Sequence, residues 1–326
     1  MTKLPSASLG LRHLGLALLA TAAISLPSTA LAQTQAQSEP AAKTSHSPSH
    51  NHAAFTSDRL HVMVDGPVGA PDVILIPGLS SSPRLWQATT DQLKGQYRVH
   101  RIHVQGFAGA PVKGNTDGPV AAPVAEEIAR YIREHDLKKP AVIGHSMGGT
   151  MGMMLSARHP DLVSKLMVVD MVPFVGAMFG PPGTTAETVV PVADQIHARQ
   201  SAYSQDEYEA AATEVITGMI KTEAARPGPL RDTLTTDIKV AANAYRELIV
   251  TDLRPELPNI TAPVEVLYVK FNDARMTDAL TDMVYSLSFA SLPSAKLKRI
   301  DDAAHFIMLD QPEIFMTEVD AFLSAK

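Results

Sequence analysis

One short segment constrains the fold of this 326-residue chain more than any other. The pentapeptide Gly144-His145-Ser146-Met147-Gly148 stands between an apolar run at 141–143 and a run rich in small residues that ends near His159. This pattern predicts a strand, a sharp turn and a helix in direct succession, because side chains at the glycine positions would collide with neighbouring backbone. A serine on such a turn is held with strained backbone dihedral angles, so Ser146 is a candidate nucleophile.

The opening residues predict an export signal. Two basic residues, Lys3 and Arg12, precede an apolar stretch from Leu14 to Ile24, and Ala30-Leu31-Ala32 offers an A-x-A cleavage site. The apolar stretch is too short to span a bilayer as a helix. We therefore expect residues 1–32 to be a signal peptide and the mature chain to be periplasmic or secreted, without a stable membrane anchor.

A tether is predicted to follow the signal peptide. Residues 33–58 are rich in Gln, Ala, Ser, Pro and His and hold few large apolar side chains, a composition typical of flexible linkers. Three histidines in this segment, His46, His50 and His52, are more simply interpreted as polar linker residues than as metal ligands. The folded part is then expected to be one domain over residues 59–326.

Composition excludes several classes of site. The chain has no cysteine, which excludes disulfides and a cysteine nucleophile. Its formal net charge is −6, and it has no basic patch typical of nucleic-acid binding. The folded part contains neither a glycine-rich phosphate-binding loop nor clustered metal-ligand spacing, so no cofactor and no metal is expected.

Apolar runs typical of buried strands alternate with helical patterns along the folded part. The predicted strands are Leu60–Val64, Val73–Ile76, Val99–Val104, Ala141–Ile143, Leu166–Val169, Val264–Val269 and Leu297–Ile300. The predicted helices are Pro83–Leu93, Ala125–His135, Thr150–Arg158 and Glu313–Leu323, with Glu187–Arg199, Asp206–Ile220 and Leu230–Val250 between two strands. This alternation predicts an α/β fold with a mostly parallel sheet covered by helices on both faces. The uninterrupted helical stretch, about 173–253, predicts an inserted cap over the carboxyl edge of the sheet.

A serine nucleophile needs a general base and a group that orients the base. His305 is the candidate base, because it follows the last predicted strand and so lies on a loop at the same sheet edge as Ser146. Asp273 is the candidate acid, because it follows the strand after the insertion and gives the chain order Ser, Asp, His. Asp170, which also ends a strand, is the alternative.

Acyl transfer also needs donors for the developing oxyanion. The backbone N–H of Met147 is one candidate, and that of Leu79, in the loop after an early strand, is the other. An apolar segment at the start of the insertion contains Phe174, Met178 and Phe179. These side chains either line an acyl pocket above Ser146 or pack the cap onto the core.

Taken together, these motifs resemble the α/β-hydrolase superfamily from about residue 59 to the C-terminus. The residues that carry the resemblance are Pro77-Gly78-Leu79, Gln105-Gly106-Phe107-Ala108-Gly109, Gly144-His145-Ser146-Met147-Gly148-Gly149, Asp273, Ala304-His305-Phe306 and Gln311-Pro312. The chain departs from the family pattern in having Pro77 where many relatives have histidine. It also has Lys270 and Phe271 where relatives usually have a glycine before the acid.

The resemblance implies hydrolysis through an acyl-enzyme on Ser146. Relatives that are haloalkane dehalogenases or epoxide hydrolases have aspartate at this position, so those reactions are not expected. The expected substrates are small-molecule carboxylic esters with small to medium apolar acyl groups. Cleavage of C–C bonds, amides or lactones, perhydrolysis, and a weakly catalytic ligand-binding role are the alternatives, and the oligomeric state is not predicted.

Overall fold

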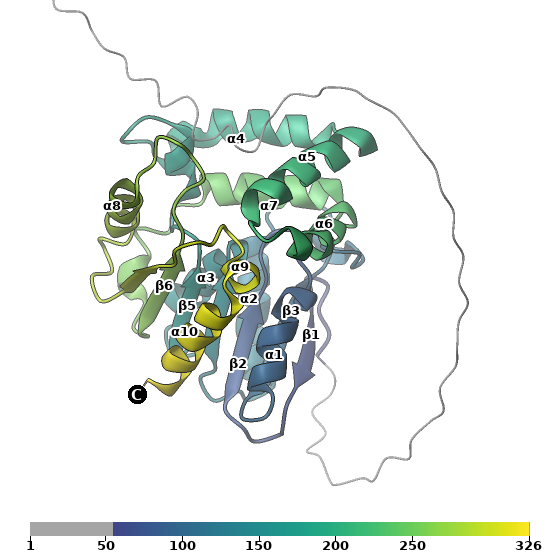
Figure 1. Ribbon diagram of the computed structural model, residues 1–326. Coiled ribbons are helices and arrows are strands. Elements are labelled where there is room, and N and C mark those ends of the chain that lie inside the picture. The colour runs from purple at the N-terminus through teal and green to yellow at the C-terminus, as the bar shows by residue number, and fades with distance from the viewer. Residues whose placement is uncertain (1–54, 326) are drawn as a thin grey trace, which may run out of the picture.

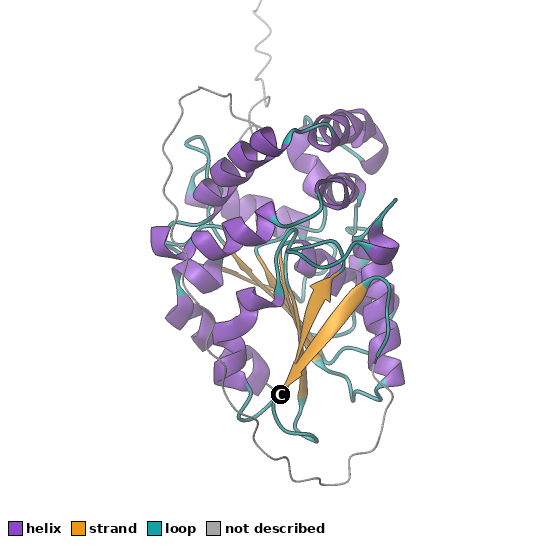
Figure 2. Cartoon of the chain, turned by 90° about the vertical axis from the view of Figure 1, so that its right-hand side faces the viewer, coloured by secondary structure: helices purple, strands orange, loops and turns teal. Residues whose placement is uncertain are grey.

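The computed structural model describes residues 55–325, which form one seven-stranded sheet with helices on both faces (Figures 1 and 2). The strands are β1 (Leu60–Asp65), β2 (Asp72–Ile76), β3 (Arg98–Val104), β4 (Ala141–His145), β5 (Lys165–Val169), β6 (Val264–Tyr268) and β7 (Lys296–Arg299). Their order is β1-β3-β2-β4-β5-β6-β7, and only β1 runs antiparallel to its neighbour. The predicted strands and the α/β class are confirmed. The predicted signal peptide and most of the predicted linker lie outside the described residues.

Both faces of the central strands are buried, as a parallel sheet requires. In β2, Ile74 and Ile76 pack toward one set of helices, whereas Val73 and Leu75 pack toward the other. The first face is covered by α2 (Ala121–Glu134), α3 (Met147–Arg158) and α8 (Asp278–Ser288). The second is covered by α1 (Gln87–Leu93) and α10 (Pro312–Ser324), which follows the single turn α9 (Ile307–Asp310).

The chain between β5 and β6 is helical throughout and lies over the carboxyl edge of the sheet (Figure 1). We refer to residues 173–253 as the cap. Its helices are η4 (Val175–Phe179), α4 (Ala186–Ser201), α5 (Gln205–Met219), η5 (Glu223–Ala225), α6 (Pro227–Leu234) and α7 (Ile238–Val250). The single helix predicted over 230–250 is wrong, because Asp237 adopts an extended backbone and its side chain accepts the Val240 N–H, which begins α7 there.

Helix α3 approaches the sheet closely enough that backbone meets backbone. A Cβ atom built on Gly144 would lie 2.2 Å from the Gly148 carbonyl oxygen, and one on Gly148 would lie 2.1 Å from the Ile76 carbonyl oxygen. No side chain can move aside to relieve either contact, since the opposing atoms belong to the main chain. These two glycines therefore fix how α3 leaves β4.

Replacement of Gly148 by Ala should destabilise the fold by at least about 2 kcal/mol, because backbone must shift to admit the methyl group. The urea midpoint of unfolding followed by far-UV circular dichroism measures this loss. Gly95→Ala is the matched control, since a Cβ atom at Gly95 meets nothing within 4 Å. Equal midpoints for the two variants would contradict the close approach of α3.

Candidate active site

Ser146 lies at the sharp turn between β4 and α3, with φ 53° and ψ −123°. This left-handed φ is strained for a residue with a side chain. The turn is held in part by the Ser146 N–H, which donates to the Val169 carbonyl oxygen at the end of β5 (2.9 Å). The predicted strand, turn and helix are thus confirmed, and the Ser146 side chain lines a large cavity beneath the cap.

The imidazole of His305 lines the same cavity and is oriented by a carboxylate. It stands in the loop between β7 and α9, and its Nδ1 is 2.6 Å from Oδ2 of Asp170. Because a carboxylate accepts, His305 Nδ1 carries the donated hydrogen, which leaves Nε2 as the basic nitrogen. Asp170 is the first residue after β5 and has a left-handed backbone with φ 52°.

Asp273 was the residue expected to orient His305, but its carboxylate pairs with an arginine instead. Its carboxylate forms a two-point ion pair with the guanidinium of Arg275, at 2.9 Å from Nε and 2.5 Å from Nη2. The partner of His305 Nδ1 is Asp170, the alternative acid. Asp170 follows β5, which lies between β4 and β6, so its carboxylate reaches the His305 loop across the end of β6. Asp273 remains part of the cavity lining.

Two further groups hold the Asp170 carboxylate, both through Oδ1. The Val269 N–H donates to it (3.1 Å), and so does the hydroxyl of Tyr285 (2.9 Å). Tyr285 is 2% exposed, and burial together with the nearby Asp170 charge raises its phenol pKa well above the ordinary value. The phenol therefore stays protonated as a donor. Tyr285 was missed in the sequence because no helix was predicted over α8, although Thr277 accepts the Leu280 N–H as an N-cap there.

His145, next to the nucleophile, is buried in the cavity lining and supports the His305 loop. It is 1% exposed, its Nε2 donates to the His305 carbonyl oxygen (2.9 Å), and its ring lies 4.7 Å from that of His305. Its buried Nδ1 has no hydrogen-bond partner among residues 55–325. Burial, reinforced by the neighbouring His305, holds the pKa of His145 well below 6.5, so this imidazole is neutral.

The two residues expected to supply oxyanion donors belong to segments that meet at Ser146. Met147 is the first residue of α3, and Leu79 follows Gly78, at which a Cβ atom would lie 3.0 Å from the Ser146 Cβ atom. Within the described part of the chain, neither the Leu79 nor the Met147 N–H has a backbone acceptor. These two N–H groups therefore remain candidates for the oxyanion donors.

The cavity above Ser146 has a volume of about 950 Å³, at the upper end of the range usual for small-molecule sites. Its roof is largely apolar, with Ala211, Ala212, Val215, Ile238, Ala241 and Leu248 from α5 and α7. Met178 and Phe179 lie in the lining, as expected for an acyl pocket. Phe174 does not. Its ring is 2% exposed and packs among Val189, Ala193 and Ile249 of α4 and α7, with the Arg254 guanidinium over its face, so it packs within the cap.

Comparison with known proteins places the chain in a family. Residues 73–318 match the sequence pattern of the Alpha/beta hydrolase family. The chain belongs to this family. As an α/β hydrolase it resembles the pimeloyl-[acyl-carrier protein] methyl ester esterase of Vibrio vulnificus (strain YJ016), with 23% identity over 82% of this chain and 98% of the esterase.

Solved structures agree with the family assignment. A hydrolase from Pseudomonas aeruginosa PA01 superposes with a TM-score of 0.68 and 19% identity, over 82% of this chain and 94% of that protein. The enol-lactonase from Burkholderia xenovorans LB400 gives a TM-score of 0.64 and 22% identity, over 82% and 96%. At these identities the similarity shows the fold alone. Of the helices in residues 55–325, none combines the length and apolar character needed to cross a membrane.

The low pKa of His145 makes the fold sensitive to acid. Unfolding lets this residue take up a proton below about pH 6.5, whereas the folded state resists it, so the free energy of unfolding falls as pH decreases. The loss approaches at most about 1.4 kcal/mol per pH unit for this group. His145→Gln should weaken the decline between pH 7 and pH 5, measured by urea unfolding at each pH. Parallel declines in both proteins would show that His145 does not titrate on unfolding.

Proposed function

We propose that this α/β hydrolase is a serine carboxylesterase, with Ser146 as nucleophile, His305 as general base and Asp170 as the orienting acid. The observation that carries the proposal is that the strained Ser146 and His305 line the same cavity, and that Nδ1 of His305 is hydrogen-bonded to the buried carboxylate of Asp170. Such an arrangement activates a hydroxyl that is otherwise a weak nucleophile. The esterase relatives from Vibrio support the choice of ester hydrolysis.

Acylation follows from this geometry. Nε2 of His305 takes the proton as Ser146 Oγ attacks the ester carbonyl, and Asp170 stabilises the imidazolium that forms. The carbonyl oxygen becomes an oxyanion that accepts hydrogen bonds from the Leu79 and Met147 N–H groups. As the C–O bond breaks, the imidazolium returns the proton to the leaving alcohol.

Deacylation repeats these steps with water. Nε2 of His305 removes a proton from water as its oxygen attacks the acyl-enzyme carbonyl, and the same donors hold the second oxyanion. Collapse of this intermediate returns the proton to Ser146 and releases the carboxylic acid. No other reactant is consumed, so one ester and one water yield one acid and one alcohol.

The cavity favours small-molecule esters with apolar acyl groups. Its lining includes Met178 and Phe179 on the cap, and methionine side chains adapt to several shapes. The same machinery would also serve lactones, amides or C–C bonds, and these belong in the substrate panel. We also propose that the enzyme acts outside the cytoplasm, on the basis of the signal-peptide pattern in residues 1–32.

The mature protein should hydrolyse p-nitrophenyl esters, and kcat/KM should increase by about fourfold per added methylene while the chain still fits, because each buried methylene contributes about 0.8 kcal/mol. The assay covers acyl lengths from acetate to dodecanoate, together with a lactone and an anilide.

Ser146→Ala is the control for this assay and should abolish turnover. Fluorophosphonate labelling at Ser146, read by mass spectrometry, tests the nucleophile without assuming a substrate. Equal turnover by the variant would refute Ser146. Labelling without ester turnover would point to one of the other substrate classes.

Asp170→Asn should reduce kcat by about a thousandfold or more, because the amide no longer fixes the productive imidazole tautomer. Asp273→Asn changes a carboxylate of the same cavity that pairs with Arg275, and should alter kcat by less than about tenfold. The two variants are compared on the best ester of the panel, with far-UV circular dichroism to verify folding. A larger loss in Asp273→Asn would reverse the assignment of the acid.

A further inference from the structure

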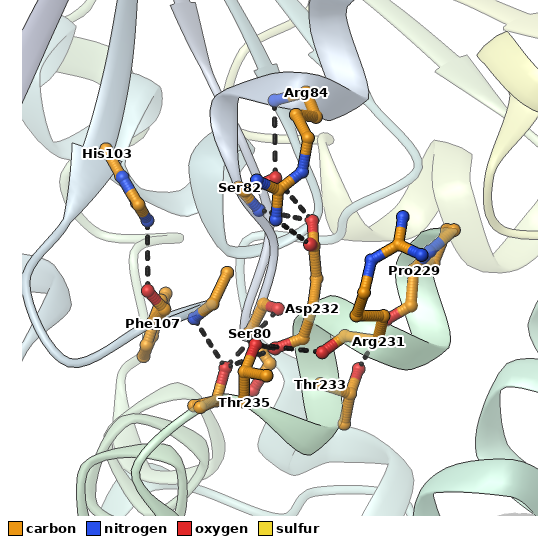
Figure 3. A network of polar contacts seen from close by, with 12 residues as sticks. Ser80, Ser82, Arg84, His103, Phe107, Pro229, Arg231, Asp232, Thr233 and Thr235 are labelled. Atoms are coloured by element: carbon orange, nitrogen blue, oxygen red, sulfur yellow. Dashed lines mark hydrogen bonds and ion pairs between the residues drawn. The ribbon is translucent and has the colours of Figure 1, made fainter. Parts of the chain in front are cut away.

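A second buried carboxylate belongs to Asp232 on α6 of the cap, and within residues 55–325 its hydrogen bonds all come from the core segment that follows β2. Asp232 is 5% exposed. Its Oδ2 accepts the N–H and the hydroxyl of Ser82 (3.0 and 2.5 Å), and its Oδ1 pairs with Arg84 Nη2 (2.5 Å) (Figure 3). Buried charges are costly unless they are paired and hydrogen-bonded, and here both carboxylate oxygens have donors.

Residues 77–82, which we call the Ser82 loop, connect β2 to the next helix and also contain Leu79. Gly78 of this loop lies against Ser146. Between Leu79 and Ser82 the chain makes a tight turn, with a left-handed φ of 58° at Ser80. The turn is closed by the Ser81 N–H, which donates to the Gly78 carbonyl oxygen (3.2 Å). Because this turn is short and hydrogen-bonded within itself, a displacement of Ser82 is transmitted to Leu79.

The part of the cap that carries Asp232 is itself anchored to the core. Asp237 N–H donates to the Gly106 carbonyl oxygen (2.9 Å), and Gly109 N–H donates to the Thr235 carbonyl oxygen (2.9 Å). The Thr236 hydroxyl accepts the Ala108 N–H (2.8 Å). Residues 235–237 are thus tied to the one core loop that follows β3, and this anchor fixes the part of the cap from which Asp232 holds the Ser82 loop.

We propose that Asp232 is a positioning residue for the oxyanion site. From the cap it holds Ser82, and through Ser82 it keeps the Leu79 N–H directed at the oxyanion. The Leu79 N–H has no backbone acceptor among residues 55–325, so bonds elsewhere in the loop must set its direction. This proposal rests on the proposed serine hydrolase mechanism, because it concerns a donor used only when an oxyanion forms at Ser146.

The test measures transition-state stabilisation separately from substrate binding. Asp232→Ala, Asp232→Asn and Ser82→Ala are compared with the wild type for kcat, KM and the Ki of an alkylboronic acid. The boronic acid forms a tetrahedral anionic adduct with the serine hydroxyl and places an oxygen at the oxyanion site. A matched control is Lys239→Met, which breaks another cap–core ion pair, that of Lys239 Nζ with Asp117 (2.6 Å), on α7 and away from the Ser82 loop.

Asp232→Ala should lower kcat by about 10-fold to 100-fold, less than the complete loss of one oxyanion donor, with KM changed by less than about threefold. The boronic acid Ki should increase by a similar factor. Asp232→Asn should show a smaller loss because one acceptor oxygen remains, and Ser82→Ala a smaller loss because its N–H still reaches Asp232. Lys239→Met should stay within about twofold of the wild type.

The proposal is overturned if the folded variants keep the wild-type kcat and boronic acid Ki. It is also overturned if their loss appears only as a raised KM, which would assign Asp232 to the shape of the cavity. If Asp232→Ala does not fold, Asp232→Asn and Ser82→Ala decide by the same readouts. A wild-type protein that fluorophosphonate does not label at Ser146 would overturn the proposed function itself, an outcome distinct from both of the others.

Discussion

The contact of α3 with β2 and β4, made through Gly144 and Gly148, is the constraint on which the rest of the site depends. It places the first turn of α3 directly above the ends of the central strands. Ser146 is thereby held in the left-handed turn between strand and helix, and Met147 becomes the first residue of the helix. A larger residue at either glycine would move the serine away from the edge where the other groups gather.

Asp170 organises the opposite side of the site. One carboxylate links the end of β5, the Val269 backbone beyond β6, Tyr285 on α8 and the His305 loop beyond β7. Since its two oxygens have separate partners, the His305 hydrogen bond uses Oδ2, while Oδ1 is occupied by the structural donors. The orientation of the imidazole is therefore set by four segments that are distant in sequence.

The sequence alone was enough to predict the features that depend on a local pattern of residues. The seven strands, the turn at Ser146 and the loop position of His305 follow from apolar runs and glycine spacing. The acid could not be decided in this way, because Asp170 and Asp273 both follow strands and only the tertiary arrangement shows which carboxylate reaches His305. Likewise, Phe174 and Phe179 stand in one apolar segment, yet only Phe179 faces the cavity.

The chain leaves the sheet at the end of β5, forms the cap and returns to the sheet at the neighbouring strand β6. The cap is therefore a module inserted between two adjacent strands. Ser146, His305 and Asp170 lie outside this module, so exchange of the cap for that of another α/β hydrolase would retain all three residues. It would nevertheless remove Asp232, whose carboxylate belongs to the cap but accepts its hydrogen bonds from Ser82 and Arg84 of the core. A chimaera built at these joints would need to supply an equivalent carboxylate over Ser82, which makes that single position a design criterion for changing the substrate range.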